Sequence, residues 1–246
     1  MAKQKGIIPL VGTLGGINFY FLKDTYVSRV AGGGFNGKAI KTKASMQRVR
    51  ENGAEFGNCS RVNKIFRTAL RVFYKGYKFS NFHSRLMTLF TNLKKLDVVN
   101  KRGERVVYEG VDTAEGMALI RQFVYTPECS VRSVLPFIFD VDRTSYALTI
   151  SDFAIKRVGF ISGATHIELT YGVLDFDFAT LDYELELATP LVLDTSFAGD
   201  SVRLVPDALP SGSGTLLCVL GVRFYQEVNG ERYLLNAADG VGILVF

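Results

Sequence analysis

The spacing of apolar residues changes along this chain, and that change constrains the fold more than any other feature. From Ser60, a residue type favoured at helix N-caps, apolar side chains recur three and four positions apart. They are Val62, Ile65, Phe66, Ala69, Leu70 and Phe73. This spacing predicts an amphipathic helix whose opposite side is cationic. The cations of that side are Arg61, Lys64, Arg67, Arg71, Lys75 and Lys78.

Two further helices are predicted after it. Apolar residues at alternating four- and three-residue steps indicate a helix from about Asn81 to Leu96. With a turn at Gly76, this helix can pack antiparallel to the first. A shorter helix is expected after Asp112, because Asp112 and Glu115 have the spacing of a capping box, and it should end near Phe123.

Beyond Pro127 the pattern becomes that of β-strands. Asn229-Gly230, between two apolar-rich runs, is the strongest hairpin signal of the chain. Many short strands with regular turns predict a sandwich, Ig-like or jelly-roll-like, so the expected fold class is α+β. The candidate strands lie near residues 135–140, 145–150, 165–171, 173–178, 181–187, 201–205, 215–225, 231–235 and 241–246.

The first 44 residues predict a separate β-hairpin arm. Two β-type runs, residues 17–21 and 26–30, flank a turn at Lys23-Asp24. A two-stranded hairpin is marginal alone, so we expect it to dock on another surface. Gly32-Gly33-Gly34 follows as a flexible joint, since it lacks the spacing of a phosphate-binding loop. The predicted segments are thus an arm at 1–44, a basic helical region at 45–126 and an acidic sandwich at 127–246.

Charge is divided unevenly between the two parts of the sequence. Residues 1–106 hold 21 Lys and Arg against 5 Asp and Glu, a net charge of +16. Residues 107–246 hold 8 Lys and Arg against 19 Asp and Glu, a net charge of −11. Such asymmetry indicates either a polyanionic partner or a partner like the chain itself, whose acidic part can receive the basic part of a neighbour.

The sequence also indicates a compartment. No apolar run is long enough to cross a membrane, and the run from Ile7 to Val11 is too short and too interrupted for a secretion signal. The three cysteines, Cys59, Cys129 and Cys218, are far apart and lack metal-site spacing, as expected of buried thiols in a reducing compartment. We therefore expect a cytoplasmic protein with no membrane partner.

Catalytic motifs are missing from the sequence. His83 and His166 are isolated, and no paired-histidine, paired-cysteine or nucleophile-elbow pattern occurs. A triad assembled from distant residues stays open as an alternative, but structural histidines are the simpler interpretation. We predict a non-enzymatic protein with no cofactor and no metal site.

The acidic part contains one constellation that could carry function. In residues 174–178 and 181–187, charged and apolar residues alternate. If these strands pair around Ala179-Thr180, five carboxylates share one sheet face: Asp175, Asp177, Asp182, Glu184 and Glu186. Such a face can be an ordinary solvated surface, a cation site or a receiving surface for a basic neighbour; a turn with glycine, normal for cation loops, is missing.

In the basic part, residues 73–79 interleave cations with aromatic rings. Rings that stack on bases beside lysines that neutralise phosphates are typical of single-strand nucleic-acid binding. The same pattern also occurs at an aromatic-lined helix corner, and Phe73 already belongs to the apolar stripe.

Six segments of the chain carry a resemblance to known sequences. They are residues 12–20, residues 50–57, residues 84–86, residues 102–105, residues 163–166 and residues 224–230. On these segments the chain resembles an uncharacterised family of hypothetical proteins from flavobacteria and related Bacteroidota. The resemblance spans nearly the whole chain and implies one shared architecture, with no activity or catalytic residue to transfer.

Together these features favour a self-assembling structural subunit of a filament, tube or shell, built through the basic arm and the acidic β part. The alternative is a nucleic-acid-binding or nucleoprotein coat subunit, with RNA or DNA as its partner. A third, weaker interpretation, a carbohydrate- or cation-binding sandwich, rests on fold analogy and the acidic hairpin alone.

Overall fold

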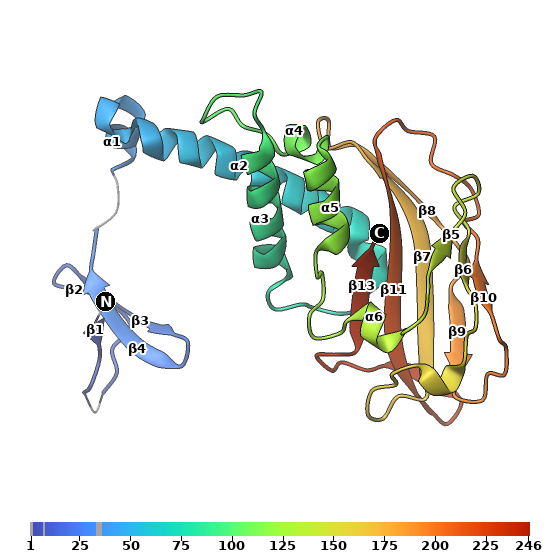
Figure 1. Cartoon of the computed structure of the whole chain (residues 1–246). Helices are drawn as coiled ribbons and strands as arrows, with labels where there is room; N and C mark the ends of the chain where they lie inside the picture. Colours follow the sequence, from blue (N-terminus) through green and yellow to red (C-terminus); the bar gives the residue numbers. More distant parts are fainter. Residues whose placement is uncertain (1, 7, 33–35) are drawn as a thin grey trace. The chain divides into compact units, whose positions relative to one another are not determined.

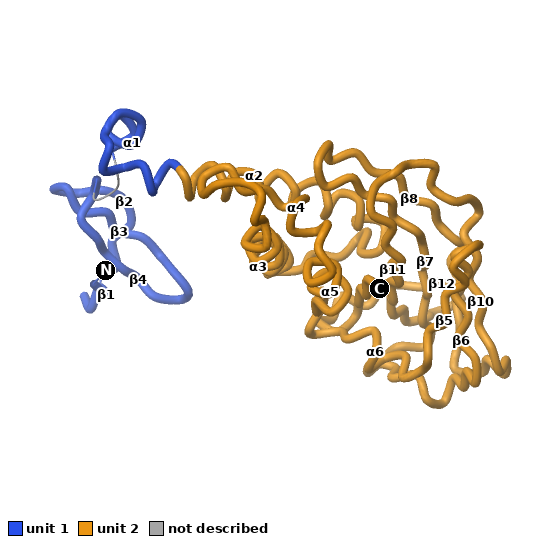
Figure 2. Tube along the Cα trace, turned by 45° about the horizontal axis from the view of Figure 1, so that its top comes forward, with its two compact units in different colours: residues 1–50 blue, residues 51–246 orange. Residues whose placement is uncertain are grey.

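The computed structural model describes residues 2–6, 8–32 and 36–246. The chain forms two compact units, Met1–Arg50 and Glu51–Phe246 (Figure 2), and each is described by itself. The predicted N-terminal arm corresponds to unit 1, which ends at residue 50 where the sequence predicts residue 44. The predicted helical and β segments belong to one unit, because they share one hydrophobic core.

Unit 1 is a four-stranded antiparallel sheet followed by short helices. The turn at Lys23-Asp24 has positive φ at both residues (45° and 59°), as a two-residue hairpin requires. The sheet is wider than the predicted hairpin, in the order β1-β4-β3-β2. Of the predicted glycine joint, Gly33 and Gly34 lie outside the described residues, as does Ile7 of the short apolar run. The elements are β1 (Ala2–Lys3), β2 (Gly12–Leu14), β3 (Ile17–Leu22), β4 (Thr25–Val30), α1 (Gly37–Thr42) and the 3-10 helix η1 (Ala44–Met46).

The helices of unit 2 differ from the predictions mainly at their ends. The first begins at Gln47 instead of Ser60, because polar contacts described below hold its N-terminal half. The third begins after Thr113, whose hydroxyl accepts from the N–H of Gly116, so Thr113 is the cap in place of Asp112. The helical elements are α2 (Gln47–Ala69), η2 (Leu70–Tyr74), α3 (Phe82–Leu93), η3 (Lys94–Leu96), α4 (Val107–Val111), α5 (Ala114–Gln122), α6 (Val131–Val134) and η4 (Ile155–Arg157).

The strands of unit 2 form two antiparallel sheets. The predicted strands 165–171 and 173–178 are one strand, β7, which runs through Gly172 without a break. Asn229 and Gly230 have positive φ and close the predicted hairpin. The predicted strand 135–140 is reduced to β5, and β9 was not expected. The strands are β5 (Asp140–Val141), β6 (Leu148–Ile150), β7 (His166–Phe176), β8 (Tyr183–Leu187), β9 (Leu191–Asp194), β10 (Val202–Leu204), β11 (Thr215–Val228), β12 (Glu231–Leu234) and β13 (Val241–Val245).

The large sheet lies between two hydrophobic layers. Its central order is β12-β11-β7-β8, with β13 beside β11 and β9 beside β7. Helices α2, α3 and α5 cover one face, and the small β10-β6-β5 sheet with α6 covers the other (Figure 1). Along β11, Leu217 and Val219 face the helices, whereas Leu220 and Val222 face the small sheet. The α+β class is confirmed, with a sandwich-like pair of sheets in the C-terminal part.

Candidate interaction surfaces

One face of the unit 1 sheet is apolar. Residues opposite each other in an antiparallel pair share a face, so the register places six apolar side chains together. We call them the apolar face: Leu14, Ile17, Phe19, Phe21, Tyr26 and Val30. The other face carries polar groups, among them Thr13, Asn18 and Arg29, whose guanidinium lies 5.6 Å from the centroid of the Tyr20 ring.

The apolar face has no covering layer within unit 1. Leu14, Ile17, Phe21 and Val30 are between 40% and 73% exposed. Among the described residues of this unit, only Val27 is buried, and it lies on the opposite face. Three or more strands need a packed hydrophobic face for independent stability. An exposed apolar surface of this kind is a candidate interaction site.

The cations predicted on the first helix lie along α2, η2 and the segment that follows. Arg67 is half-buried, and its Nε donates to Oδ1 of Asn63 at 2.9 Å. The other five, Arg61, Lys64, Arg71, Lys75 and Lys78, are exposed, and we call them the basic surface. None of them forms an ion pair with a carboxylate of the described residues. Their charge is therefore available to a partner.

The aromatic rings beside these cations pack against each other. Phe73 is fully buried in the core. The Phe79 ring lies 5.5 Å from Tyr74, 4.8 Å from Tyr77 and 5.1 Å from Phe82, measured between centroids. The Tyr77 hydroxyl also donates to the carbonyl of Ala237 at 3.0 Å. Tyr77 and Phe79 are nevertheless only half-buried, and with Lys78 they line a pocket of about 170 Å³. Phe73 is thus excluded from contact with a base, whereas Tyr77 and Phe79 keep part of their surface open.

The predicted acidic hairpin forms, and four of its five carboxylates, Asp175, Asp177, Asp182 and Glu184, line one cleft. Asp175 lies opposite Glu184, and Glu186 follows two residues later on the same face. Asp177 and Asp182 lie beyond the last strand pair, in the turn. Asp175 is only 3% exposed, because the 211–214 loop covers it and the N–H of Gly214 donates to its Oδ1 at 2.9 Å. Asp175 is therefore a structural carboxylate that cannot receive a neighbouring subunit.

Beside the buried Asp175, the carboxylates of Asp177, Asp182 and Glu184 line this cleft of about 340 Å³ with the 211–214 loop, and Glu186 does not. Asp177 accepts from the N–H groups of Thr180 and Ala179, and these bonds lower the pKa of its carboxyl. Glu184 accepts from the N–H of Ser211 at 2.7 Å. The carboxylate of Asp182 forms no hydrogen bond or ion pair with the described residues and is exposed. Asp177 and Glu184 thus hold the backbone of neighbouring loops, whereas the carboxylate of Asp182 faces solvent.

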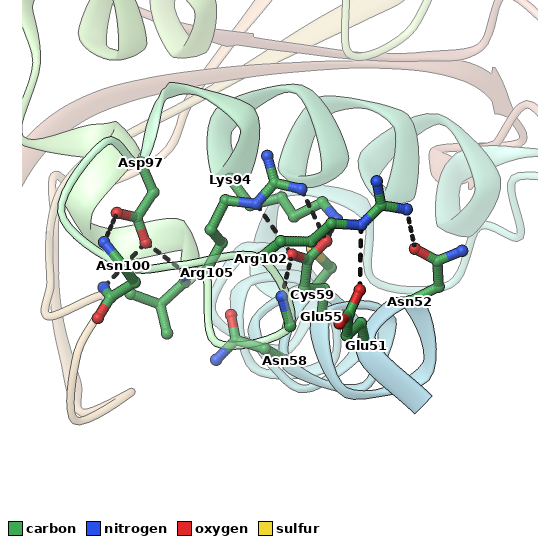
Figure 3. A network of polar contacts seen from close by, with 12 residues as sticks. Glu51, Asn52, Glu55, Asn58, Cys59, Lys94, Asp97, Asn100, Arg102 and Arg105 are labelled. Carbon is green, nitrogen blue, oxygen red and sulfur yellow. Dashed lines mark hydrogen bonds and ion pairs between the residues drawn. The ribbon is translucent and has the colours of Figure 1, made fainter. Parts of the chain in front are cut away.

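A buried ion network that the sequence reasoning missed holds α2 to the loop before α4 (Figure 3). Glu55 is 1% exposed, and its carboxylate accepts from Nε of Arg105 at 2.9 Å and from the N–H of Gly103 at 2.8 Å. Lys94 pairs with the same carboxylate. Burial alone would raise the pKa of Glu55, but Arg105, Lys94 and Gly103 together lower it to about 2. The sequence did contain a signal for this buried carboxylate. Glu55 precedes Cys59 and Val62 by four and seven residues, which places it in line with the apolar side of the helix.

The same loop is fixed at its other end by Asp97. Its buried carboxylate accepts from the N–H groups of Val99, Asn100 and Val106. Burial opposes ionisation of Asp97, but these bonds prevail and lower its pKa. Arg102 adds contacts with Glu51 and Asn52 of α2. The network is a structural device, because its charges are paired with each other.

The two histidines differ in their surroundings, and His166 is the one that touches both a hydroxyl and a carboxylate among the described residues. His83 is exposed at the start of α3. His166 lies 3.4 Å from Glu227, between Nε2 and Oε2, and its Nδ1 lies 2.9 Å from the Thr165 hydroxyl. That hydroxyl already accepts from the N–H of Glu227, and the neighbouring cleft is lined by other residues, including Glu168 and Tyr225. The Thr165 hydroxyl is thus engaged by the N–H of Glu227, and Thr165 is not among the residues that line this cleft.

Within the described ranges, no group of three metal-ligating side chains gathers, and no helix is long and apolar enough to cross a membrane. All three cysteines are free and buried. The chain matches no protein-family model, and no curated protein or solved structure is significantly similar to it.

Proposed function

We propose that this chain is a non-enzymatic structural subunit that associates with further copies of itself into a filament, tube or shell. The observation that carries the proposal is the apolar face, a sheet surface of six apolar side chains, four of which unit 1 leaves exposed. Nine Lys and Arg against one Asp in residues 1–50 add a charge of +8 that needs an acidic partner.

The apolar face can supply useful binding energy. Full burial of a Val, Leu, Ile or Phe side chain contributes about 1.5 to 3 kcal/mol. Leu14, Ile17, Phe21 and Val30 are on average a little over half exposed, so covering all four contributes about 4 to 7 kcal/mol. The surface that covers them adds a similar term, which the loss of freedom on association then reduces.

Substitution on the two faces of one sheet tests the proposal. Phe21→Lys with Val30→Lys places charge on the apolar face, and Leu22→Lys places it on the opposite face at a comparably exposed site. We expect the wild type and the Leu22→Lys control to form assemblies in sedimentation velocity, and the double variant to be monomeric. A wild type that stays monomeric at every concentration tested, or a double variant that assembles normally, contradicts the proposal.

Two further parts of the proposal concern the cellular compartment and the protein family. Three buried free thiols support residence in the cytoplasm, where thiols stay reduced. We further propose that the chain belongs to the flavobacterial family that its sequence resembles. Two of the resembling segments, 50–57 and 102–105, meet in the structure through Glu55 with Arg105 and Glu51 with Arg102. A protein from that family with the same ion network would strengthen this assignment.

A nucleic-acid coat subunit is the second candidate, and the unpaired basic surface favours it. Five exposed cations without carboxylate partners can neutralise phosphates. Nuclease treatment of purified assemblies separates the two candidates. Assemblies that survive nuclease and show the absorbance ratio of pure protein support a protein-only structure, and assemblies that dissolve support the coat.

A further inference from the structure

We infer that a pocket at the corner between η2 and α3, within unit 2, binds one nucleotide of a single-stranded nucleic acid. The inference goes beyond self-association and does not depend on it. The pocket has a volume of about 170 Å³, and we call it the corner pocket. Among its lining residues, those that carry the argument are Tyr77, Lys78, Phe79, Asn81, Arg85 and Glu128.

Two cations line the corner pocket without a carboxylate partner. Lys78 is exposed, and neither Lys78 nor Arg85 forms an ion pair with a carboxylate of the described residues. Arg85 is half-buried: its Nη2 donates to the carbonyl of Val124, and its guanidinium lies 5.3 Å from the centroid of the Phe123 ring. Its Nε is buried and has no hydrogen-bond acceptor in the described part of the chain. A partly buried guanidinium without a counterion favours a bound anion, and phosphate matches its planar fork of donors.

The start of α3 adds to this positive character. Asn81, the N-cap, and Phe82, the first helical residue, also line the pocket. The side chain of Asn81 forms no cap hydrogen bond, and the first turn of the helix holds no acidic residue. The N–H groups of a first turn carry partial positive charge and favour an anion beside them. Together with Lys78 and Arg85, this end of the helix makes the pocket suitable for a phosphate group.

Two aromatic rings give the pocket a surface for a base. Tyr77 and Phe79 are half-buried, and their ring centroids lie 4.8 Å apart. The Tyr77 hydroxyl donates to the carbonyl of Ala237 at 3.0 Å, so its ring is held in place before a ligand binds. Rings that can stack on a base beside cations that neutralise phosphates are typical of single-strand binding. The pocket therefore suits a nucleotide better than a phosphate ion alone.

The cations that precede the pocket favour a strand over a free nucleotide. Arg71 and Lys75 are exposed members of the basic surface, seven and three residues before Lys78. Successive phosphates of one strand can contact these cations while one nucleotide occupies the pocket. A duplex cannot bind in this way, because its bases stack on each other and are not open to Tyr77 and Phe79.

One lining residue, Glu128, opposes an anion. Its carboxylate is exposed and forms no hydrogen bond or ion pair with the described residues. Burial raises the pKa of Tyr77, and the charge of Glu128 adds to that rise, as expected of a carboxylate near this ring. Glu128 should therefore weaken the binding of a phosphate, and removal of its charge should strengthen it. A gain of affinity on neutralising Glu128 indicates an anion bound in this pocket.

Fluorescence anisotropy of a labelled single-stranded oligothymidylate, titrated with the full chain at low salt, tests the inference. Lys78→Glu should weaken binding about tenfold and lower the slope of log Kd against log salt by about 0.7, since one phosphate contact is lost. Tyr77→Leu removes the ring and should also weaken binding about tenfold, but with an unchanged salt slope, because stacking releases no counterions. Glu128→Gln should strengthen binding about twofold.

Matched variants separate the pocket from charge in general and from folding. Lys156→Glu reverses an exposed lysine of η4, whose Ile155 packs in the core on the other face of the large sheet, and should bind within about twofold of wild type. Tyr77→Phe keeps the ring while losing the bond to Ala237, and it should bind as the wild type does. Melting curves confirm that each variant is folded.

Four outcomes would overturn the inference. They are a wild type that binds no single strand at low salt, and a Lys156→Glu variant that loses as much affinity as Lys78→Glu. The third is a duplex bound as tightly as the strand with no loss in Tyr77→Leu, and the fourth is thymidine monophosphate bound as tightly as the oligonucleotide. The pocket variants should still assemble in sedimentation velocity, so this inference can fail while the proposed function stands.

Discussion

Replacing Glu55 by Ala should destabilise unit 2 severely, because the substitution removes a buried carboxylate and leaves two half-buried cations, Lys94 and Arg105, without their counterion. Nε of Arg105 lies 2.9 Å from the carboxylate, the N–H of Gly103 lies 2.8 Å from it, and Lys94 pairs with it as well. Removing one partner of a buried ion pair costs about 3 to 5 kcal/mol. The lowered pKa gives an independent magnitude. The difference between the ordinary value of 4.5 and about 2 corresponds to about 3 kcal/mol of stability at neutral pH.

The sign of the pH dependence follows from the direction of that shift. A carboxyl whose pKa is lower in the folded state stabilises the protein above its unfolded pKa, and the contribution is lost as pH falls toward the folded value. For Glu55 the window runs from about pH 4.5 down to about pH 2. The wild type should lose this stability between those pH values, and Glu55→Ala should lack the corresponding part of the pH dependence.

Urea unfolding with the Glu104→Ala variant as control measures the effect. Glu104 pairs with Lys101 at 3.1 Å on the exposed side of the same loop, and such surface pairs contribute about 0 to 1 kcal/mol. The expected result is a large drop in the urea midpoint for Glu55→Ala and a small one for Glu104→Ala, with unchanged m-values. If both variants lose less than about 1 kcal/mol, the buried network does not stabilise the loop as described.

Three further predictions concern the same framework. Gly103→Ala should destabilise unit 2, because Gly103 has φ of +95° and an added Cβ would lie 2.8 Å from Cγ of Glu51; a melting temperature equal to wild type would refute the close approach. Phe66→Ala should cost about 3 to 5 kcal/mol in urea unfolding, since its buried ring contacts Phe90 and Phe176, whereas Phe56→Ala, on the exposed side of α2, should cost under about 0.5. Removal of residues 1–44 should leave the melting transition of unit 2 in place while abolishing assembly; particles identical to wild type would show that the arm is not the connector.

Local sequence patterns were sufficient to predict the elements that interactions between neighbouring residues determine. The period of apolar residues placed α3 within a few residues, and Asn229-Gly230 and Lys23-Asp24 marked hairpin turns because both need positive φ. The alternation at residues 181–187 likewise predicted β8 and its pairing with β7. The α+β class followed from the change of period near Pro127.

The tertiary structure decided what depends on contacts between distant residues. Gln47 to Cys59 is helical because Glu55 and its neighbours are held by residues 94–105, a partnership that no local pattern encodes. The alternating pattern of residues 174–178 predicts that Asp175 faces solvent. In the structure the loop at residues 211–214, some forty residues later, buries it. The helices and sheets form one unit because Phe66 and Phe176 meet across the core, and the apolar face became visible only when the register placed Phe21 and Val30 on one side. Periodicity specifies which face of an element is apolar; which partner covers that face is fixed only by packing in three dimensions.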